Sequence, residues 1–390
     1  MKMEGSWWRS RNELDDEQEA VIKLPADGRF FIVGPPGCGK TNLLVLRAAF
    51  LAKAKYKDLA ILTYTNSLVD FIQSGVAPPI ETHQVHTHIG WLRSIVFPRL
   101  HKDVVSEIKG IDDVIMQRKR LAEEFLLLSG NEDVGNLLQT VFVDEVQDFL
   151  ASELRAVVAA SERVTVAGDA RQSVYNGDAL AALDELGFKQ IVLKRHYRIG
   201  HAIAKVADRL IEPESPDKSL FKTSHYDETK LASNADLLEL NSRDEQFTEM
   251  LAKVRTQLKA FPKEFIGILV PKRDNIADLR ERFSDTDLDS LIAYHDDFSE
   301  DSSFSGPYRI HVMTIKASKG TEFRAVHLFA CEDAQWPQVS RKFWYTAVTR
   351  ARTSLTAYAS PGQKPLSARL RAAFTEETVP EIDSLFGGLV

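Results

Sequence analysis

The sequence predicts an α/β protein in which helices cover parallel β-sheets. Short runs of strand-forming residues alternate with amphipathic helical stretches throughout the chain, which is the pattern of a parallel α/β fold. With 390 residues, 44% of them apolar, the chain is long enough for two domains with separate cores. Because a predicted strand ends just before Lys194, we place a first domain at 1–193 and a second at 194–390.

Ten apolar segments are predicted as strands, and they cover residues 29–33, 59–63, 141–143, 164–167, 191–193, 237–240, 265–270, 310–315, 325–329 and 355–358. The stretch 98–136 departs from the alternation, because apolar residues recur near one helical face over 111–128. It therefore predicts a small helical insert in the first domain, over about 92–137. The polar, breaker-rich segments 212–217 and 285–305 are predicted as surface loops of the second domain.

Composition narrows the classes of function. The net charge is −7 at pH 7, which argues against nucleic-acid binding over the whole surface but is compatible with a local basic groove. Apolar runs stay below the roughly 18 residues of a membrane span, and the N-terminal residues lack a signal-peptide pattern. We therefore expect a soluble, cytoplasmic protein. With Cys38 and Cys331 as its cysteines, the chain is not expected to have a disulfide framework or a cysteine-based metal site.

Residues 34–41 match the phosphate-binding pattern G-x-x-x-x-G-K-[ST]. A predicted strand precedes them and a predicted helix over 41–54 follows, which is the context that such a loop requires. The backbone N–H groups are expected to surround the phosphates, with Lys40 on the β and γ phosphates and Thr41 on Mg²⁺. The other loop residues predicted to contact the nucleotide are Gly34, Pro35, Gly37, Cys38 and Gly39.

Residues 141–148 run from three apolar strand formers into a cluster of carboxylates. A buried strand that ends in acids is the arrangement with which a nucleotidase holds Mg²⁺ and aims a water at a phosphate. Asp144 is expected to hold Mg²⁺ through water, and Glu145 to act as the general base or to orient the attacking water. The alternative is a strand end capped by solvated acids. The two segments together predict a nucleoside triphosphatase.

Further short motifs occur in a recognisable order. They lie at 14–18 (Leu-Asp-Asp-Glu-Gln), 62–66 (Leu-Thr-Tyr-Thr-Asn), 144–148 (Asp-Glu-Val-Gln-Asp), 168–175 (Gly-Asp-Ala-Arg-Gln-Ser-Val-Tyr), 196–198 (His-Tyr-Arg), 318–323 (Ser-Lys-Gly-Thr-Glu-Phe) and 345–352 (Tyr-Thr-Ala-Val-Thr-Arg-Ala-Arg). In this order they resemble the Q motif and motifs Ia, II, III, IV, V and VI of superfamily 1A helicases of the UvrD/Rep type. The resemblance covers nearly the whole chain.

The resemblance implies two RecA-like P-loop NTPase domains in tandem, with ATP and Mg²⁺ in the cleft between them. Gln18 would read the edge of the adenine, and Tyr197 would stack on its ring. Glu322 matches the residue that contacts the ribose.

The resemblance also implies how the γ-phosphate is handled. Gln172 would sense it, while Arg198 and Arg350 from the second domain would stabilise charge on the transferring phosphoryl group. For Arg350 the alternative is a surface arginine of an amphipathic helix. The predicted catalytic residues are therefore Lys40, Glu145, Gln172, Arg198 and Arg350.

A track for single-stranded DNA is implied over Tyr64, Thr65, Asn66, Trp91 and Thr314. Aromatic rings stack on bases of any sequence and contribute about 1–3 kcal/mol per base. For Trp91 an alternative stays open, in which the ring packs against the helical insert.

Four features differ from the family pattern. After Tyr175 the chain continues Asn-Gly-Asp, where many relatives carry a tryptophan that stacks on a base. Asn42 replaces an adenine-stacking arginine, and Lys316 replaces the histidine of motif V. The short spacing between Arg198 and Thr314 leaves no room for the large accessory 2B domain.

The leading hypothesis is an ATPase that is stimulated by single strands and translocates 3′→5′ on DNA, with strand separation that is weak or needs a partner. The second hypothesis is a subunit in which ATP and DNA binding switch a protein partner, for instance a nuclease of a repair or defence complex. A motor on RNA is a third, because the motifs do not distinguish the two sugars well. No association with a membrane is expected.

Overall fold

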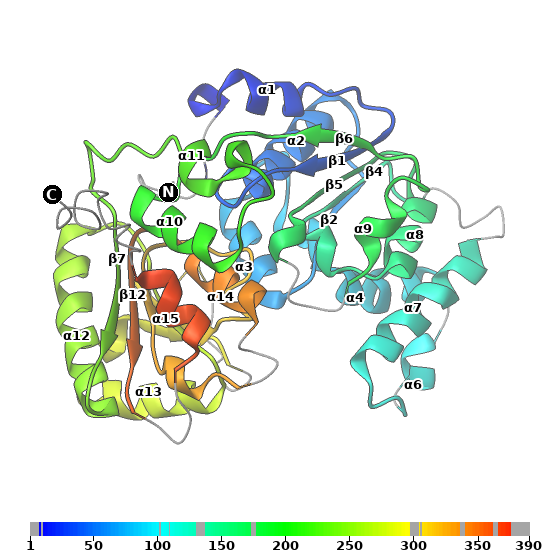
Figure 1. Ribbon diagram of the computed structural model, residues 1–390. Helices are drawn as coiled ribbons and strands as arrows, with labels where there is room; N and C mark the ends of the chain where they lie inside the picture. The colour runs from blue at the N-terminus through cyan, green and yellow to red at the C-terminus, as the bar shows by residue number, and fades with distance from the viewer. Residues whose placement is uncertain are drawn as a thin grey trace, which may run out of the picture.

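Two six-stranded parallel sheets form two RecA-like domains that lie side by side (Figure 1). The computed structural model describes residues 8, 11–100, 103–108, 110–129, 137–172, 177–296, 304, 306–335, 340–361 and 366–375. The strand order is β3-β2-β4-β5-β1-β6 in the first sheet and β7-β12-β11-β8-β10-β9 in the second. The predicted fold class, an α/β protein with two tandem domains of this type, is confirmed.

The strands of the first sheet are β1 Arg29–Val33, β2 Leu59–Thr63, β3 Val85–Thr87, β4 Thr140–Val143, β5 Val164–Gly168 and β6 Lys189–Val192. Those of the second sheet are β7 Asn234–Glu239, β8 Ile266–Val270, β9 Ile292–Tyr294, β10 Ile310–Thr314, β11 Phe323–Leu328 and β12 Ala351–Ala359. The central strands β2, β4, β5 and β8 are buried along their whole length. Helices cover both faces of such strands, which is why they read as continuous apolar runs in the sequence.

Two strands differ from the prediction. The strand β3 is not predicted by the sequence pattern. The strand β9 lies inside residues 285–305, for which the sequence pattern predicts a surface loop. The loop prediction is wrong for Ile292, Ala293 and Tyr294, which are buried and form a strand, β9, paired with β10. Three residues are too few for an apolar pattern to stand out from polar neighbours. Residues 297–303 and 305 lie outside the described part of the chain.

The helices of the first domain are α1 Asp16–Ile22, α2 Lys40–Ala54, α3 Asn66–Gly75, α4 His88–Trp91, α5 Phe97–Arg99, α6 Val104–Ile108, α7 Val114–Ser129, α8 Ala151–Ala160 and α9 Ala179–Ala182. Those that follow are α10 His201–Leu210, α11 Leu220–Thr223, α12 Arg243–Ala260, α13 Asp274–Ser284, α14 Arg341–Val348 and α15 Ala368–Phe374. Short 3₁₀ or π turns are η1 Arg11–Glu13, η2 Thr82–Gln84, η3 Leu92–Val96, η4 Val146–Asp148, η5 Ala170–Gln172, η6 Pro216–Lys218, η7 Asp289–Leu291 and η8 Cys331–Asp333. No helix among the described residues combines the length and the apolar character that a membrane crossing requires.

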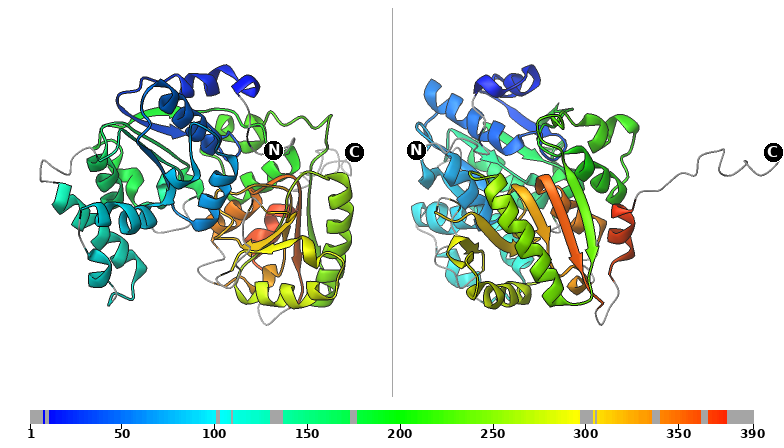
Figure 2. Two further views of the ribbon diagram at one scale, coloured as in Figure 1. Left: turned by 180° about the vertical axis from the view of Figure 1, so that it is seen from behind. Right: turned by 90° about the vertical axis from the view of Figure 1, so that its left-hand side faces the viewer.

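The helices α5 to α7 fall within the predicted insert. Leu121 and Phe125 of α7 join Leu154 and Val157 of α8 in one apolar core. In Figure 1 and in the left view of Figure 2, α6 and α7 project from the first domain on the side away from the second. The insert is therefore anchored through α7 to the domain that carries it.

The two domains also share an apolar core. Phe71 of α3 meets Phe304 of the second domain edge to face, with ring centroids 5.8 Å apart, and Phe304 stacks on His311 of β10 at 4.4 Å. Gly320 adopts φ +80°, and a Cβ atom there would lie 2.6 Å from the Leu68 side chain. This close packing brings residues 314–322 of the second domain against the first, beside the loops that carry the predicted motifs.

Candidate active site and nucleic-acid groove

The segment between β1 and α2 forms the predicted phosphate-binding loop. Gly37 and Gly39 have φ values of +76° and +90°, in the left-handed region that favours glycine. At Gly34 a Cβ atom would lie 2.8 Å from the Cys38 sulfur. The buried Lys40 amine donates to the Gly34 carbonyl at 2.9 Å, so the loop curls around it. Burial raises the pKa of the Cys38 thiol, which therefore acts as a neutral spacer.

Asp144 and Glu145 follow β4 at the carboxyl edge of the first sheet, and both are buried. Thr41 Oγ1 donates to Asp144 Oδ2 at 2.6 Å. Burial, and then the charge of Glu145, raises the pKa of Asp144 to about 7. A divalent cation would stabilise two adjacent buried acids, and Mg²⁺ prefers hydroxyl and carboxylate oxygens. Thr41 and Asp144 therefore fit a magnesium ion.

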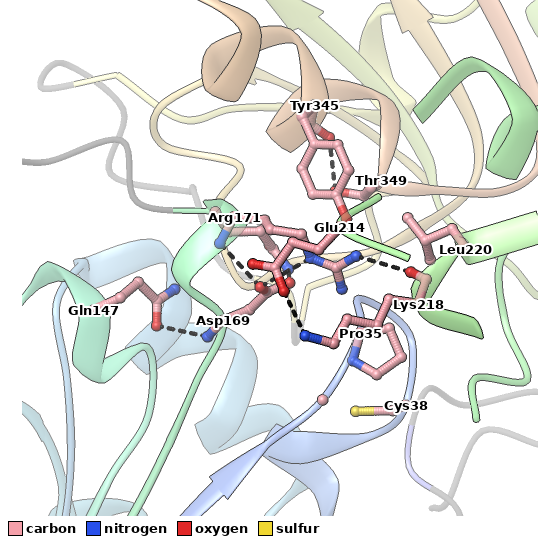
Figure 3. Close-up of polar contacts among 12 residues, drawn as sticks. Pro35, Cys38, Gln147, Asp169, Arg171, Glu214, Lys218, Leu220, Tyr345 and Thr349 are labelled. Atoms are coloured by element: carbon pink, nitrogen blue, oxygen red, sulfur yellow. Dashed lines mark hydrogen bonds and ion pairs between the residues drawn. The ribbon is translucent and has the colours of Figure 1, made fainter. Parts of the chain in front are cut away.

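Gln147 joins the ends of β4 and β5. Its Nε2 donates to the Glu145 carboxylate, and its Oε1 accepts the backbone N–H of Asp169 at 3.0 Å (Figure 3). Glu145 has φ +54°, unusual for a residue other than glycine, and this turn directs its side chain out of the strand. Gln147 thus holds the Glu145 carboxylate in place. The sequence reasoning assigned no such role to Gln147, although the spacing Asp-Glu-x-Gln-Asp carried the signal.

A small cavity of about 30 Å³ lies between the domains at this point. Its lining comprises Pro36, Gly37, Gly39, Lys40, Thr41, Glu145, Gln172, Arg198, Gly320, Glu322 and Arg350. The structure therefore brings all five predicted catalytic residues to one cavity. The side chains of the two domains therefore leave little free space at this point.

Both arginines of the second domain have partners in this cavity. Arg350 donates to the Gln172 side chain across the domain interface, and its Nε bonds the Thr346 carbonyl at 3.0 Å. Arg198 pairs with Glu322 at 2.6 Å. Burial raises the pKa of Glu322, but the charges of Arg198, Arg352 and Arg350 and the bond from Arg198 together outweigh burial and keep the pKa below its usual value. The two guanidinium groups thus lie beside the phosphate loop.

The residues predicted to contact adenine lie next to the loop rather than in the cavity. Gln18 is buried, bonds Asp15 as part of a helix cap, and donates to the Cys38 carbonyl at 2.9 Å. Tyr197 donates its hydroxyl to Asp15, and its ring lies 5.5 Å from that of His225. Burial, and then Asp15, raises the pKa of Tyr197 to about 12. The contacts of these side chains with one another hold α1 against the start of the second domain.

A second, larger cavity of about 820 Å³ opens between the domains. Three predicted nucleic-acid-binding residues, Thr65, Asn66 and Thr314, line it. Its other lining residues are Ser67, Asp70, Pro271, Lys272, Arg273, Asp274, His295, Asp296, Lys316 and Ala317. The sequence reasoning missed Lys272 and Arg273, although they lie just after Pro271, which follows the predicted strand 265–270 at the end where parallel sheets carry their sites. We call this cavity the groove.

The other two predicted nucleic-acid contacts do not line the groove. Trp91 is 2% exposed and packs with Phe125, their ring centroids 6.3 Å apart, in the core beneath the insert. The prediction that Trp91 stacks on a base is therefore wrong, and the packing alternative is right. The Tyr64 ring lies under the Arg118 guanidinium at 4.6 Å, and its hydroxyl accepts from the same group at 3.2 Å. Tyr64 thus contacts the insert helix α7, not the groove.

One short segment connects the groove with the catalytic cavity. Thr314, Lys316 and Ala317 line the groove, while Gly320 and Glu322 line the cavity. Between them lies Lys319, which is 2% exposed. Its amine pairs with the buried Asp148 of the first domain and donates to the Gln172 carbonyl. The segment that lines the groove is thus bonded through Lys319 to Asp148 and to Gln172 of the first domain.

Comparison with known families agrees with the two-domain arrangement. Residues 17–178 match a family described as an AAA domain, and residues 309–358 match the UvrD-like helicase C-terminal domain. No curated protein sequence matches the chain.

One similar solved structure is described as "The structure of PRRSV helicase". It is 16% identical, and the match covers 87% of this chain and 54% of the other, with a TM-score of 0.41. This chain thus spans about half the length of that protein. Similarity at this level carries no argument about function.

Proposed function

The chain belongs to the UvrD/Rep type of superfamily 1 helicases, and on this basis we propose that it hydrolyses ATP between its two domains and moves 3′→5′ along single-stranded DNA. In this proposal the first domain covers 1–193, with the insert at about 92–137, and the second covers 194–390. The observation that supports it best is the segment 314–322, which lines the groove at one end and the catalytic cavity at the other. Such a link is what a motor needs in order to couple hydrolysis to movement.

The proposed chemistry assigns one task to each residue of the cavity. Lys40 and the loop N–H groups bind the phosphates. Glu145, held by Gln147, orients the attacking water and takes its proton. Arg198 and Arg350 exchange their present partners for the γ-phosphate, so ATP draws the domains together and hydrolysis lets them part. Mg²⁺, held by Thr41 and Asp144, would neutralise charge on the phosphates.

In this proposal, single-stranded DNA binds in the groove. Lys272, Arg273 and Lys316 supply positive charge for the phosphates of the strand, although the chain as a whole carries a net charge of −7. Asn66 and Thr314 offer polar groups from the two domains, so closure of the domains moves the contacts on one side of the strand relative to the other. The carboxylates of Asp70, Asp274 and Asp296 in the same lining repel phosphate and confine it to the basic part.

A second candidate function is an ATP- and DNA-gated subunit that switches a protein partner such as a nuclease. Two features of the sequence favour it: the absence of the tryptophan after Tyr175, and the short spacing between Arg198 and Thr314. Residues 173–176 lie outside the described part of the chain.

ATP hydrolysis measured with oligo-dT of increasing length separates these functions. A translocase shows stimulation that rises with length and then levels off, whereas a switch is fully stimulated by the shortest oligonucleotide that binds. Equal stimulation by oligo-rU favours a motor on RNA. Lys40→Ala is expected to abolish hydrolysis, and hydrolysis that survives this change would remove the catalytic assignment.

The direction of movement is tested by displacement of streptavidin from biotinylated oligo-dT. A 3′→5′ motor clears streptavidin from the 5′ end faster than from the 3′ end. Equal rates at both ends would contradict directional movement.

A further inference from the structure

Arg171 lies immediately before Gln172 on η5 and is not among the residues that line the catalytic cavity. Its backbone N–H donates to Asp169 Oδ1 at 3.0 Å, and its Nε lies 3.3 Å from the same oxygen (Figure 3). These two bonds fix the guanidinium relative to the end of β5. Arg171 is therefore anchored in the first domain by the residue that Gln147 also holds.

From this anchor the guanidinium reaches α14 of the second domain. It lies 5.8 Å from the centre of the buried Tyr345 ring. The backbone N–H of Thr349 donates to the Tyr345 carbonyl at 3.0 Å. Arg350 is the next residue after Thr349. Burial opposes the positive charge, yet Tyr345 and Asp169 outweigh it and hold the pKa of Arg171 above its usual value. Arg171 thus contacts the helix whose end presents Arg350 to Gln172.

The same guanidinium reaches a second element of the second domain. Its Nη1 lies 3.5 Å from the Lys218 carbonyl, just before α11 (Figure 3). The segment that follows is bonded to motif IV, since the His196 ring donates to the Leu220 carbonyl at 2.6 Å and the His196 N–H to Thr223 at 3.1 Å. This motif carries Arg198. Arg171 therefore contacts α14, whose end presents Arg350, and the end of η6, which leads into the segment that is bonded to the part of the chain carrying Arg198.

We propose that Arg171 is a positioning residue that holds η5 in register with the second domain, so that Gln172 meets Arg350 and Arg198 only when the domains are docked. This inference rests on ATP hydrolysis in the proposed cavity, but not on movement along DNA. Arg171 touches no reacting atom. Its removal leaves the phosphate loop and the groove intact and loosens the alignment of the residues that act on the γ-phosphate.

Steady-state ATP hydrolysis at saturating oligo-dT tests the proposal. Arg171→Ala is expected to lower kcat by about 10- to 100-fold, the effect of a misplacement of about 1 Å, while KM for ATP changes by less than about threefold. Arg171→Lys restores part of kcat, because the charge returns without the planar group. A kcat of Arg171→Ala within about twofold of the wild type would overturn the proposal.

A double-mutant cycle shows whether Arg171 acts through its neighbour. In a Gln172→Ala background, Arg171→Ala is expected to lower kcat by less than about twofold further, because the group that it positions is already gone. Independent, multiplying effects would refute a positioning role.

Two control variants change residues that contact Arg171 but keep the atoms that it contacts. Tyr345→Phe retains the ring, and Lys218→Ala retains the carbonyl that Arg171 approaches, so both are expected to keep wild-type kcat. If either control variant lost as much activity as Arg171→Ala, the region would tolerate no change at all. That result would overturn the specific role of Arg171.

Hydrogen exchange provides a measurement that does not depend on turnover. Peptides that cover 168–172 and 345–350 are expected to exchange faster in Arg171→Ala than in the wild type or in Lys218→Ala. Unchanged exchange in these peptides would overturn the proposed docking, even if the chain proved not to move along DNA.

Discussion

Lys319→Met is expected to lower the free energy of unfolding by about 3–5 kcal/mol. Lys319 and Asp148 form an ion pair between the domains, and their side chains are 2% and 0% exposed. Removal of the amine leaves the carboxylate of Asp148 in the interior without its cation, and breaking a buried pair in this way costs about 3–5 kcal/mol. The loss of the bond to the Gln172 carbonyl acts in the same direction.

Lys218→Met provides a matched control. Lys218 pairs with Glu214 at the surface, where the two side chains are 60% and 80% exposed, so the same chemical change should cost about 0–1 kcal/mol. Urea unfolding can be followed by tryptophan fluorescence, because Trp91 and Trp344 are buried in different domains. With an m-value of about 2–3 kcal/mol/M, Lys319→Met should shift the midpoint by about 1 M or more.

The double variant Lys319→Met, Asp148→Leu completes the test. Replacing both members of a buried pair by apolar groups is close to neutral, so the second change should restore most of the stability. The reasoning is refuted if Lys319→Met unfolds within about 1 kcal/mol of Lys218→Met. It is also refuted if the second change lowers stability further.

Three further predictions concern the groove, the core and the insert. Lys272→Ala should weaken binding of single-stranded DNA and reduce the slope of log affinity against log salt by about 0.7, and an unchanged slope in a salt titration would remove Lys272 from the strand contacts. Trp91→Ala should lower the free energy of unfolding by about 3–5 kcal/mol, because it empties a core position, and the DNA affinity of the folded variant should stay at the wild-type value. Burial raises the pKa of Glu153, but bonds and charges of His88 and Arg118 outweigh it and lower the pKa to about 2. Since this folded pKa lies below the ordinary value of about 4.5, Glu153 contributes stability above pH ~4.5 that is lost as pH falls towards 2. The stability gap between wild type and Glu153→Gln, on the order of 3 kcal/mol, should therefore close over that range in acid unfolding, and a constant gap would contradict the assignment.

The phosphate loop and the acids after β4 show what local sequence can specify. Residues 34–41 combine a strand end, glycines at positive φ and a helix start, and each of these depends on neighbours in the chain. Asp144 and Glu145 likewise follow a strand whose apolar run is continuous. The sequence therefore predicted the conformation and burial of these two segments, because the backbone geometry and burial of a short segment follow from its own pattern.

Trp91 and β9 show where the local pattern was insufficient. A tryptophan after a turn is compatible with a base-stacking platform or with a core position, and only the packing of α7 against α8 shows that Trp91 is enclosed. The three apolar residues of β9 become a strand because β10 offers a free edge. Each outcome depends on a partner that lies far away in the chain.

By itself, the sequence determined the fold class, the phosphate-binding loop and the identity of five of the residues that line the cavity between the domains. The tertiary structure alone decided that Lys272 and Arg273 share a groove with Asn66, that Lys319 pairs with Asp148, and that Arg171 reaches both α14 and η6. The physical reason is distance along the chain. Motif patterns record the conformation of a segment, whereas contacts between segments that are far apart in the chain arise only when the domains pack against each other.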